Sequence, residues 1–363
     1  MGADAGALAR RHRQQRQHQR PHRWHRPAWW PRARRVAWAV FLLVTAALLV
    51  HLGRGLDWAG AVQALRALPV GWLWIAAGGV ALAYAAFASY ELLGRAMTPE
   101  RVADAGIRLG RRWLLAVGFV TFAVKLSLGA LVGGVAMRYR LYGRLGLPVE
   151  TTTRLLAASL VTNWIGYVAL LGGLLLWQPP ALPPEWGEIA RAGSGVLRGV
   201  GGLMLAGCAA YLVACVRPPG QARTLHWRDH AISLPPARAA LGQFVLSGLH
   251  WASTAGVCWA LLGGQVGYAA VLGALLLSAV AGVVTHVPGG LGVLEAVFIA
   301  MLQGQVAQGP LLGALLAFRA LYYVVPLGVA LPLFLWVDRR GAGAAQRAPA
   351  GASPRPTAPR PPL

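Results

Sequence analysis

Residues 285–296, THVPGGLGVLEA, place a proline, three glycines and a carboxylate within a long apolar region. Proline removes a backbone donor and glycine lowers helix stability, so a helix is expected to end near His286. The residues that interrupt it are Pro288, Gly289, Gly290 and Gly292. In a membrane, interrupted backbone is tolerated only where protein buries it or where it lines a wet cavity. The segment therefore predicts either the turn of a hairpin or a kink that allows close helix packing.

A second helix is expected to begin near Leu291, and the positive dipole character of its first N–H groups would suit an anion such as a lipid phosphate. Glu295 falls in the first turn of that helix, where the dipole favours a carboxylate. An ionisable group at membrane depth needs a partner. Arg319, in the next apolar segment, is the candidate, although it could instead snorkel or face a cavity. Tyr322 and Tyr323 follow, and they either add hydroxyl donors or pack as an aromatic pair.

The composition indicates a membrane protein. Of 363 residues, 56% are hydrophobic and only 12% are charged, which is far too apolar for an ordinary soluble domain. A helical span needs about 20 apolar residues, and several segments approach or exceed that length. They include residues 36–52, 69–93, 155–177 and 311–337. The three cysteines lie in apolar segments without metal-ligand spacing, so we interpret them as packing residues. The chain is predicted to be an all-α polytopic membrane protein.

Both ends of the chain differ in composition from the rest. An arginine-rich segment, residues 1–35, precedes the first apolar segment, and a Pro/Ala-rich segment, residues 339–363, ends the chain. Both are predicted to be disordered cytoplasmic tails. A basic arm beside a membrane span is most often a topology signal and a contact for anionic lipid, so no nucleic-acid partner is expected. The long basic flank also argues against a secretory signal peptide.

The placement of arginine and lysine predicts the topology. If every apolar segment crossed the membrane once, two arginine-bearing loops, residues 138–154 and 217–238, would lie outside and violate the positive-inside rule. If residues 113–137 instead enter and return on the cytoplasmic side, most basic residues lie inside. Residues 268–303 are expected to form a second hairpin that opens outward, because the arm after the PGGLG break is too short to span the membrane.

These assignments give six full spans and two re-entrant hairpins, in the order span, span, hairpin, span in each half. The half-repeats cover about residues 36–178 and 195–338, within a transmembrane domain of residues 36–338. Three crossings in the first half invert the second half. Inverted repeats with broken segments near the midplane are typical of many secondary transporters. Eight plain transmembrane helices remain the alternative.

Other polar residues lie inside or beside the predicted membrane segments. Lys125, the only lysine in the chain, lies in the first hairpin and would bind an anion or pair with a carboxylate. Arg138 and Arg140 follow at the expected cytoplasmic mouth, where they either attract an acidic headgroup or only satisfy the topology rule. Asn163 and His250 lie within spans, where such residues more often hydrogen-bond a neighbouring helix than bind a ligand.

The sequence shows no motif of a common catalytic or nucleotide-binding class. It has no GxxxxGK[ST] motif, no HExxH motif and no Ser/His/Asp constellation, and its internal loops are too short for a separate catalytic domain. We therefore expect no cofactor, no metal and no enzymatic activity. A membrane enzyme acting on lipid-linked substrates would need a nucleophile or a metal cluster that the sequence does not show.

Four segments, in this order and spacing, resemble the flippase-like transmembrane domain of lysylphosphatidylglycerol synthases and its stand-alone relatives in bacterial inner membranes. They are RYRLYGRLGL (138–147), NWIGY (163–167), HVPGGLGVLEAVFIAML (286–302) and FRALYYVVPL (318–327). The resemblance runs over about residues 36–338 and implies an all-helical bundle with re-entrant segments that binds or moves a phospholipid. The residues that match the family's central site are Pro288, Gly289, Gly290, Gly292, Glu295, Arg319 and Tyr323.

Two departures from the family pattern bear on function. The soluble acyltransferase-like domain that attaches the amino acid is not in this sequence, so the resemblance does not imply synthesis of lysyl lipid. Relatives often have a basic residue before the glutamate, where this chain has Leu294. That difference bears on headgroup preference.

The leading hypothesis is an integral protein of the bacterial inner membrane, with both termini cytoplasmic, that binds and translocates an anionic or aminoacylated phospholipid. The headgroup would enter past Arg138 and Arg140 and meet Lys125 and the helix end at Leu291. The alternative is a non-transporting membrane partner or regulator of a lipid-synthesis enzyme, in which the buried charges are structural.

Overall fold

The computed structural model describes residues 62–63, 66–98, 110–180, 187, 193–216, 224–227, 230–285, 287 and 290–346. The predicted N-terminal tail and the apolar segment 36–52 lie outside the described residues. Nearly all of the described chain is helical, which confirms the predicted all-α class. Its last helix continues to Gln346, past the predicted domain boundary at residue 338.

The first half of the chain contributes two long helices and a shorter pair between them. The long helices are α4, Val70–Met97, and α8, Val149–Trp177. The shorter pair consists of α6, Arg111–Leu128, a π-helical segment η1, Ala130–Ala136, and α7, Met137–Arg144.

The second half has a corresponding order of elements. It begins with α10, Gly193–Cys215, and α11, Ala237–Leu261. Two short antiparallel strands, β1, Thr224–Trp227, and β2, His230–Ser233, lie in the loop between these helices. The remaining elements are α12, Tyr268–Thr285; α13, Val293–Leu302; α14, Gln308–Arg319; the π-helical segment η4, Ala320–Val324; and α15, Val325–Gln346.

Within the described residues, six helices are long and apolar enough to cross a membrane. They are α4, α8, α10, α11, α12 and the continuous helix Gln308–Arg340, which joins α14, η4 and α15. The chain is therefore a multi-pass membrane protein. The set includes α12, which was expected to form the first arm of the second hairpin. The re-entrant placement of the hairpins stays a prediction, and so does the alternative of eight plain helices.

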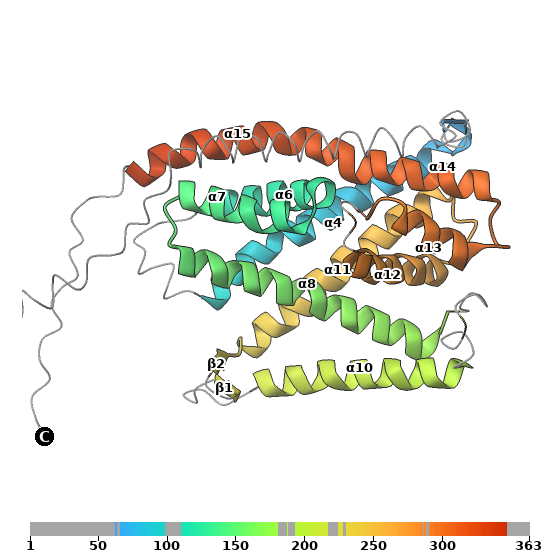
Figure 1. The fold of residues 1–363 in the computed structure, drawn as a ribbon, viewed down its shortest axis with the longest axis horizontal. Coiled ribbons are helices and arrows are strands. Elements are labelled where there is room, and N and C mark those ends of the chain that lie inside the picture. The colour runs from blue at the N-terminus through green and yellow to red at the C-terminus, as the bar shows by residue number, and fades with distance from the viewer. Residues whose placement is uncertain are drawn as a thin grey trace, which may run out of the picture. The chain divides into compact units, whose positions relative to one another are not determined.

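Helices α4 and α11 lie side by side and run diagonally between the other helices (Figure 1). They run antiparallel, because Trp72 packs against Trp259 near one end of the pair and His250 bonds the carbonyl of Ala83 further along. Gly79 allows a close approach, since a Cβ at this position would lie 2.9 Å from Cγ2 of Val257. Small residues let membrane helices pack backbone to backbone.

The helix contacts of the two halves correspond. In the first half α4 contacts α6 and α8, and in the second half α11 contacts α12 and α14. Across the halves, α6 packs on α15, and α12 packs on α8. Exchanging the halves therefore maps each of these contacts onto another one. Together with the antiparallel course of α4 and α11, this is the arrangement that an inverted repeat produces.

Residues 111–144 fold back on themselves as a helical hairpin. Near its start, Trp113 stacks on Trp336 of α15 with ring centroids 4.5 Å apart. At its end, Arg144 forms an ion pair of 3.4 Å with Asp338, also on α15. Both ends of the segment thus lie beside the same end of α15. The hairpin predicted over residues 113–137 is present as a fold, and its returning arm continues to Arg144.

The turn of this first hairpin depends on glycine. Gly129 ends α6 with a φ of +87°, which glycine adopts without steric cost. Gly133 then packs so closely on the other arm that a Cβ would lie 2.0 Å from the backbone nitrogen of Lys125. The two arms can therefore touch only because position 133 has no side chain.

The second hairpin has its break where the PGG stretch predicts it. Helix α12 ends at Thr285 and α13 begins at Val293, each within two residues of the expected boundary. Gly290 and Gly292 have φ values of +58° and +78°, while Pro288 and Gly289 lie outside the described residues. A helix as short as α13 is about 15 Å long at ~1.5 Å per residue, too short for a hydrocarbon core of about 30 Å.

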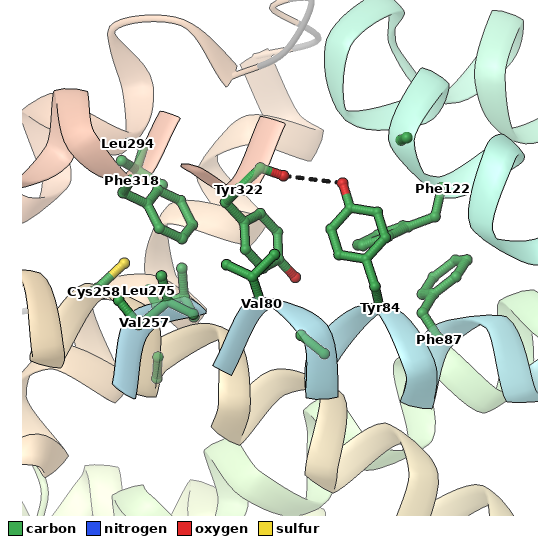
Figure 2. Packing of buried hydrophobic residues seen from close by; sticks show 14 of the residues in the cluster. Val80, Tyr84, Phe87, Phe122, Val257, Cys258, Leu275, Leu294, Phe318 and Tyr322 are labelled. Atoms are coloured by element: carbon green, nitrogen blue, oxygen red, sulfur yellow. Dashed lines mark hydrogen bonds between the residues drawn. The ribbon is translucent and has the colours of Figure 1, made fainter. Parts of the chain in front are cut away.

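The core lies around the α4–α11 pair and includes side chains from both hairpins. Figure 2 shows Tyr84 and Phe87 of α4 beside Phe122 of α6, and Phe318 and Tyr322 on the facing helix. Phe87 and Phe122 stack with ring centroids 4.0 Å apart. The three cysteines are buried in α10 and α11, as expected for packing residues.

Candidate functional site

The predicted pair between Glu295 and Arg319 is present. Nε of Arg319 donates to Oε1 of Glu295 at 2.5 Å, and Nη2 donates to Oε2 at 2.9 Å, so the contact is bidentate. Only 14% of each side chain is exposed. Nη2 of Arg319 also donates to the backbone carbonyl of Gly290 at 3.0 Å. One guanidinium therefore holds both the carboxylate and the interrupted backbone before α13.

The first turn of α13 is occupied by the protein's own carboxylate. Oε2 of Glu295 accepts a hydrogen bond of 2.9 Å from the N–H of Gly292. Leu291 lies in the turn just before it and is half-buried. An anion bound at this helix end would therefore have to share its donors with Glu295 or displace that carboxylate.

Tyr322 and Tyr323 lie in η4 and take different partners. The hydroxyl of Tyr322 lies 2.7 Å from the Thr254 hydroxyl, and its backbone carbonyl accepts a bond of 2.9 Å from the Tyr84 hydroxyl (Figure 2). The ring of Tyr323 lies against Arg319, with its centroid 5.5 Å from the guanidinium carbon. Tyr322 thus joins η4 to α4 and α11, while Tyr323 flanks the ion pair.

Lys125 lies in an aromatic environment. Its Nζ lies 5.3 Å from the ring centroid of Phe87 and 5.8 Å from that of Phe122. The side chain is half-buried. Among the described residues, no Asp or Glu forms an ion pair with it. Aromatic faces attract a cation but leave its charge uncompensated.

Arg138 is placed differently from the expectation. It was assigned to a basic mouth with Arg140, yet only 4% of its side chain is exposed. Nε and Nη2 donate to Oε1 of Glu91 at 2.8 and 2.6 Å. Nη2 also donates to the Ser159 hydroxyl at 2.9 Å, and Nη1 donates to the Gly134 carbonyl at 3.0 Å. The expected position was wrong because a carboxylate on α4 draws the side chain inward.

The sequence analysis missed Glu91, although it carries the same signal as Glu295, a lone carboxylate within an apolar segment. Its side chain is fully buried on α4. Besides Arg138, it accepts a hydrogen bond of 2.5 Å from the Tyr142 hydroxyl. Glu91, Arg138 and Tyr142 therefore join α4 to the returning arm of the first hairpin.

The other two predicted residues lie apart from these clusters. Arg140 is 54% exposed at its side chain and pairs with Asp338 at 3.3 Å, so it does lie toward the surface. Asn163 is buried, and its backbone carbonyl accepts bonds from the Ser247 hydroxyl at 2.9 Å and the Trp251 indole at 3.1 Å. The backbone of Asn163 thus takes part in the contact between α8 and α11, and these two bonds do not involve its side-chain amide.

These helices and their buried charges define an all-α, multi-pass membrane protein whose membrane region holds ion pairs and a lysine. The family model described as "Lysylphosphatidylglycerol synthase TM region" matches residues 36–330. The chain belongs to this family.

Two relatives show the extent of the similarity. The chain is 37% identical over 310 residues to "Inner membrane protein YbhN" of Escherichia coli (strain K12), which covers 85% of this chain and 93% of that protein. It is 31% identical over 217 residues to "Uncharacterized protein slr0712" of Synechocystis sp., which covers 59% of this chain and 65% of that protein. The similarity to the first relative thus includes nearly its whole length.

Proposed function

We propose that this protein binds a phospholipid or a lipid-linked headgroup in the membrane and moves it between the leaflets. The observation that carries the proposal is the charge balance of three cations in the membrane region, Arg138, Arg319 and Lys125. Glu91 neutralises Arg138, and Glu295 neutralises Arg319. Lys125 has no such carboxylate among the described residues. A cation at membrane depth is costly without a counter-charge, and an anionic headgroup would supply one.

The arrangement of the hairpins supports movement as well as binding. One hairpin lies beside α4 and the other beside α11, and the contacts of one half repeat in the other. In inverted-repeat transporters, the two halves rock around a site near the midplane and expose it to either side in turn. The segments η1 and η4 have π-helical instead of α-helical hydrogen bonding, and such segments are frequent at functional sites.

The proposed location is the inner membrane, with both termini in the cytoplasm. The similarity to a protein named as an inner membrane protein supports the location. The orientation rests on the positive-inside rule. This rule favours the cytoplasmic side for the arginine-rich N-terminal segment and for the arginine-bearing loops, residues 138–154 and 217–238. In this orientation, the ends of α7 and α15 that meet at Asp338 are cytoplasmic, and the end of α8 at Trp177 is periplasmic.

A translocation assay tests the proposal. Wild type, Lys125→Gln and the charge-conserving control Lys125→Arg are reconstituted in liposomes with fluorescent phosphatidylglycerol or phosphatidylcholine. We expect Lys125→Gln to lose translocation of the anionic lipid and Lys125→Arg to keep most of it. Thermal unfolding should show Lys125→Gln at least as stable as wild type, because the substitution removes an uncompensated charge. Wild-type rates equal to those of empty liposomes for both lipids would contradict the proposal.

The second candidate, a non-transporting partner of a lipid-synthesis enzyme, is favoured by one observation. Both buried arginines have their guanidinium groups bonded within the chain, as structural charges would. A structural pair can be replaced by neutral groups at little cost. If Glu295→Gln combined with Arg319→Met keeps full cellular function while no lipid is translocated, this candidate is preferred.

A further inference from the structure

A groove of about 540 Å³ lies between α8 and α12, at the end of α8 that precedes the loop to α10. Its walls are formed by residues of both helices. They include Ala169, Gly173 and Trp177 of α8, Gln178 directly after it, and Tyr268 and Ala269 of α12. The surface is mainly apolar, and Gln178 and Tyr268 are its polar residues at one end. The Tyr268 hydroxyl donates to the backbone carbonyl of Ala252 on α11 at 2.8 Å. No residue of the Lys125 or Arg319 clusters belongs to it.

The dimensions and polarity of the groove match one leaflet of a bilayer. From Ala169 to Gln178, α8 rises about 14 Å at ~1.5 Å per residue, which is about half of a hydrocarbon core of about 30 Å. Trp177 is 72% exposed at the polar end, and tryptophan and tyrosine are enriched where a membrane meets water. The polar end therefore lies at headgroup level, and the apolar walls run from there toward the membrane centre.

Beyond the lining residues, on the side away from Gln178, α8 and α12 are bonded to each other. The Tyr167 hydroxyl donates to the backbone carbonyl of Leu276 at 2.7 Å and bridges α8 to α12. Beside the groove, Gly273 approaches Leu174 so closely that a Cβ would lie 3.2 Å from its Cδ2. An open, mainly apolar groove on the surface of the helices suits a hydrocarbon chain. It does not suit a continuous water path.

The other contact between the halves, that of α6 with α15, is filled by side chains. Exchange of the halves maps the α8–α12 contact onto the contact between α6 and α15. There, Trp113 and Trp336 stack with an interplanar angle of 18°, and Arg140 and Arg144 both pair with Asp338. We call these two contacts between the halves the α8–α12 seam and the α6–α15 seam. They differ, because the α8–α12 seam contains a groove and the α6–α15 seam is filled by aromatic rings.

From these observations we infer that the α8–α12 groove binds one acyl chain of a phospholipid, with the headgroup beside Gln178, and that it is the open one of two lateral lipid portals. The assignment of this portal to the periplasmic leaflet rests on the proposed function and its orientation. The binding of an acyl chain in the groove does not rest on the proposed function, because it does not require that the lipid be moved.

Photo-crosslinking tests the occupancy. The protein is reconstituted with phosphatidylglycerol that carries a diazirine on one acyl chain, and labelled peptides are identified by mass spectrometry. In wild type, we expect the labelling of residues 169–178 and 268–272 to exceed severalfold that of α10, whose exposed face contacts bulk lipid. Ala169→Phe should remove most of this excess by filling the groove, and Ala269→Phe should do so from the opposite wall. The matched control is Ala206→Phe on the exposed face of α10, which should leave the excess unchanged.

The outcomes separate this inference from the proposed function. Groove labelling no higher than that of α10 in wild type, or unchanged by both groove variants, overturns the inference. Strong groove labelling that Ala169→Phe removes supports it, even if the translocation assay shows no transport. If the variants also lose translocation, the groove is on the transport path.

Discussion

Two carboxylates within the membrane region, Glu91 and Glu295, each form an ion pair with an arginine. Each of these arginines also donates a hydrogen bond to a backbone carbonyl. Arg138 also donates to the carbonyl of Gly134 in η1, and Arg319 donates to the carbonyl of Gly290 before α13. Interrupted helices leave carbonyls without their usual partners. Arg319 therefore neutralises a charge and bonds the backbone at the break before α13, while Arg138 neutralises a charge and bonds the carbonyl of the residue four positions before it.

Removing one member of the Glu295–Arg319 pair should be costly. Arg319→Met leaves a carboxylate that is mostly buried, and the free energy of unfolding should fall by about 3 kcal/mol. The double variant Glu295→Gln with Arg319→Met should recover most of this loss, since no charge is left unpaired. Unfolding in detergent, followed by circular dichroism, measures both.

The matched control for this pair is Arg140→Met, which breaks an ion pair with a half-exposed arginine. Its effect on unfolding should stay within about 1 kcal/mol, because surface pairs contribute little. If Arg140→Met costs as much as Arg319→Met, burial does not determine the strength of these pairs.

At the scale of elements, the close contacts between helices depend on where glycine lies. Gly166 on α8 faces α11, and a Cβ there would lie 2.3 Å from Cβ of Ser247. Gly118 on α6 similarly approaches α4, with 2.8 Å from a Cβ to Cα of Ala88. These positions let polar groups such as the Asn163 carbonyl reach the next helix. Interhelical packing of this kind replaces the hydrophobic driving force that is absent in lipid.

Gly166→Ala should therefore destabilise the protein, even though alanine favours a helix. Overpacking of a tight contact costs about 1–3 kcal/mol, which exceeds the gain in helix propensity of roughly 1 kcal/mol. Gly248→Ala on α11 is the matched control, because no atom lies within 4 Å of its added Cβ. It should leave the melting temperature unchanged or raise it. A similar fall for both variants would show that crowding at Gly166 is not the cause.

At the scale of the whole membrane region, the two halves have corresponding helix contacts, but the two contacts between the halves are not packed alike. The α6–α15 seam is closed by a tryptophan stack, while the α8–α12 seam contains a groove. If the halves rock during transport, the closed seam must open when the other closes. The difference between the seams is then the conformational difference between the two sides of the cycle.

Fixing the closed seam should stop the cycle. In a background without the native cysteines, Trp113→Cys with Trp336→Cys is treated with a short bismaleimide and assayed for lipid translocation. We expect translocation to stop after cross-linking, while lipid labelling of the α8–α12 groove persists. The single variant Trp113→Cys, treated in the same way, should keep its activity. Undiminished translocation in the cross-linked double variant would show that this seam need not open.

The positions of the membrane helices, the break before α13 and one ion pair are predictable from local sequence. The apolar segments predict the membrane helices, because a span must bury about 20 residues in lipid. The PGG stretch predicts the break before α13, since proline and glycine act on their own backbone wherever they lie. The partner of Glu295 was also predictable, because Arg319 is the nearest arginine in the next helix.

Other features depend on the tertiary structure alone. Nothing near Arg138 in the chain indicates that Glu91, on a different helix, removes it from the surface. The closed and open seams depend on pairs such as Trp113 and Trp336, which lie more than 200 residues apart in the sequence. Local backbone chemistry thus determined the helices and their breaks. The pairing of charges and the difference between the seams were decided by helix packing, because those contacts join residues that only the folded chain brings together.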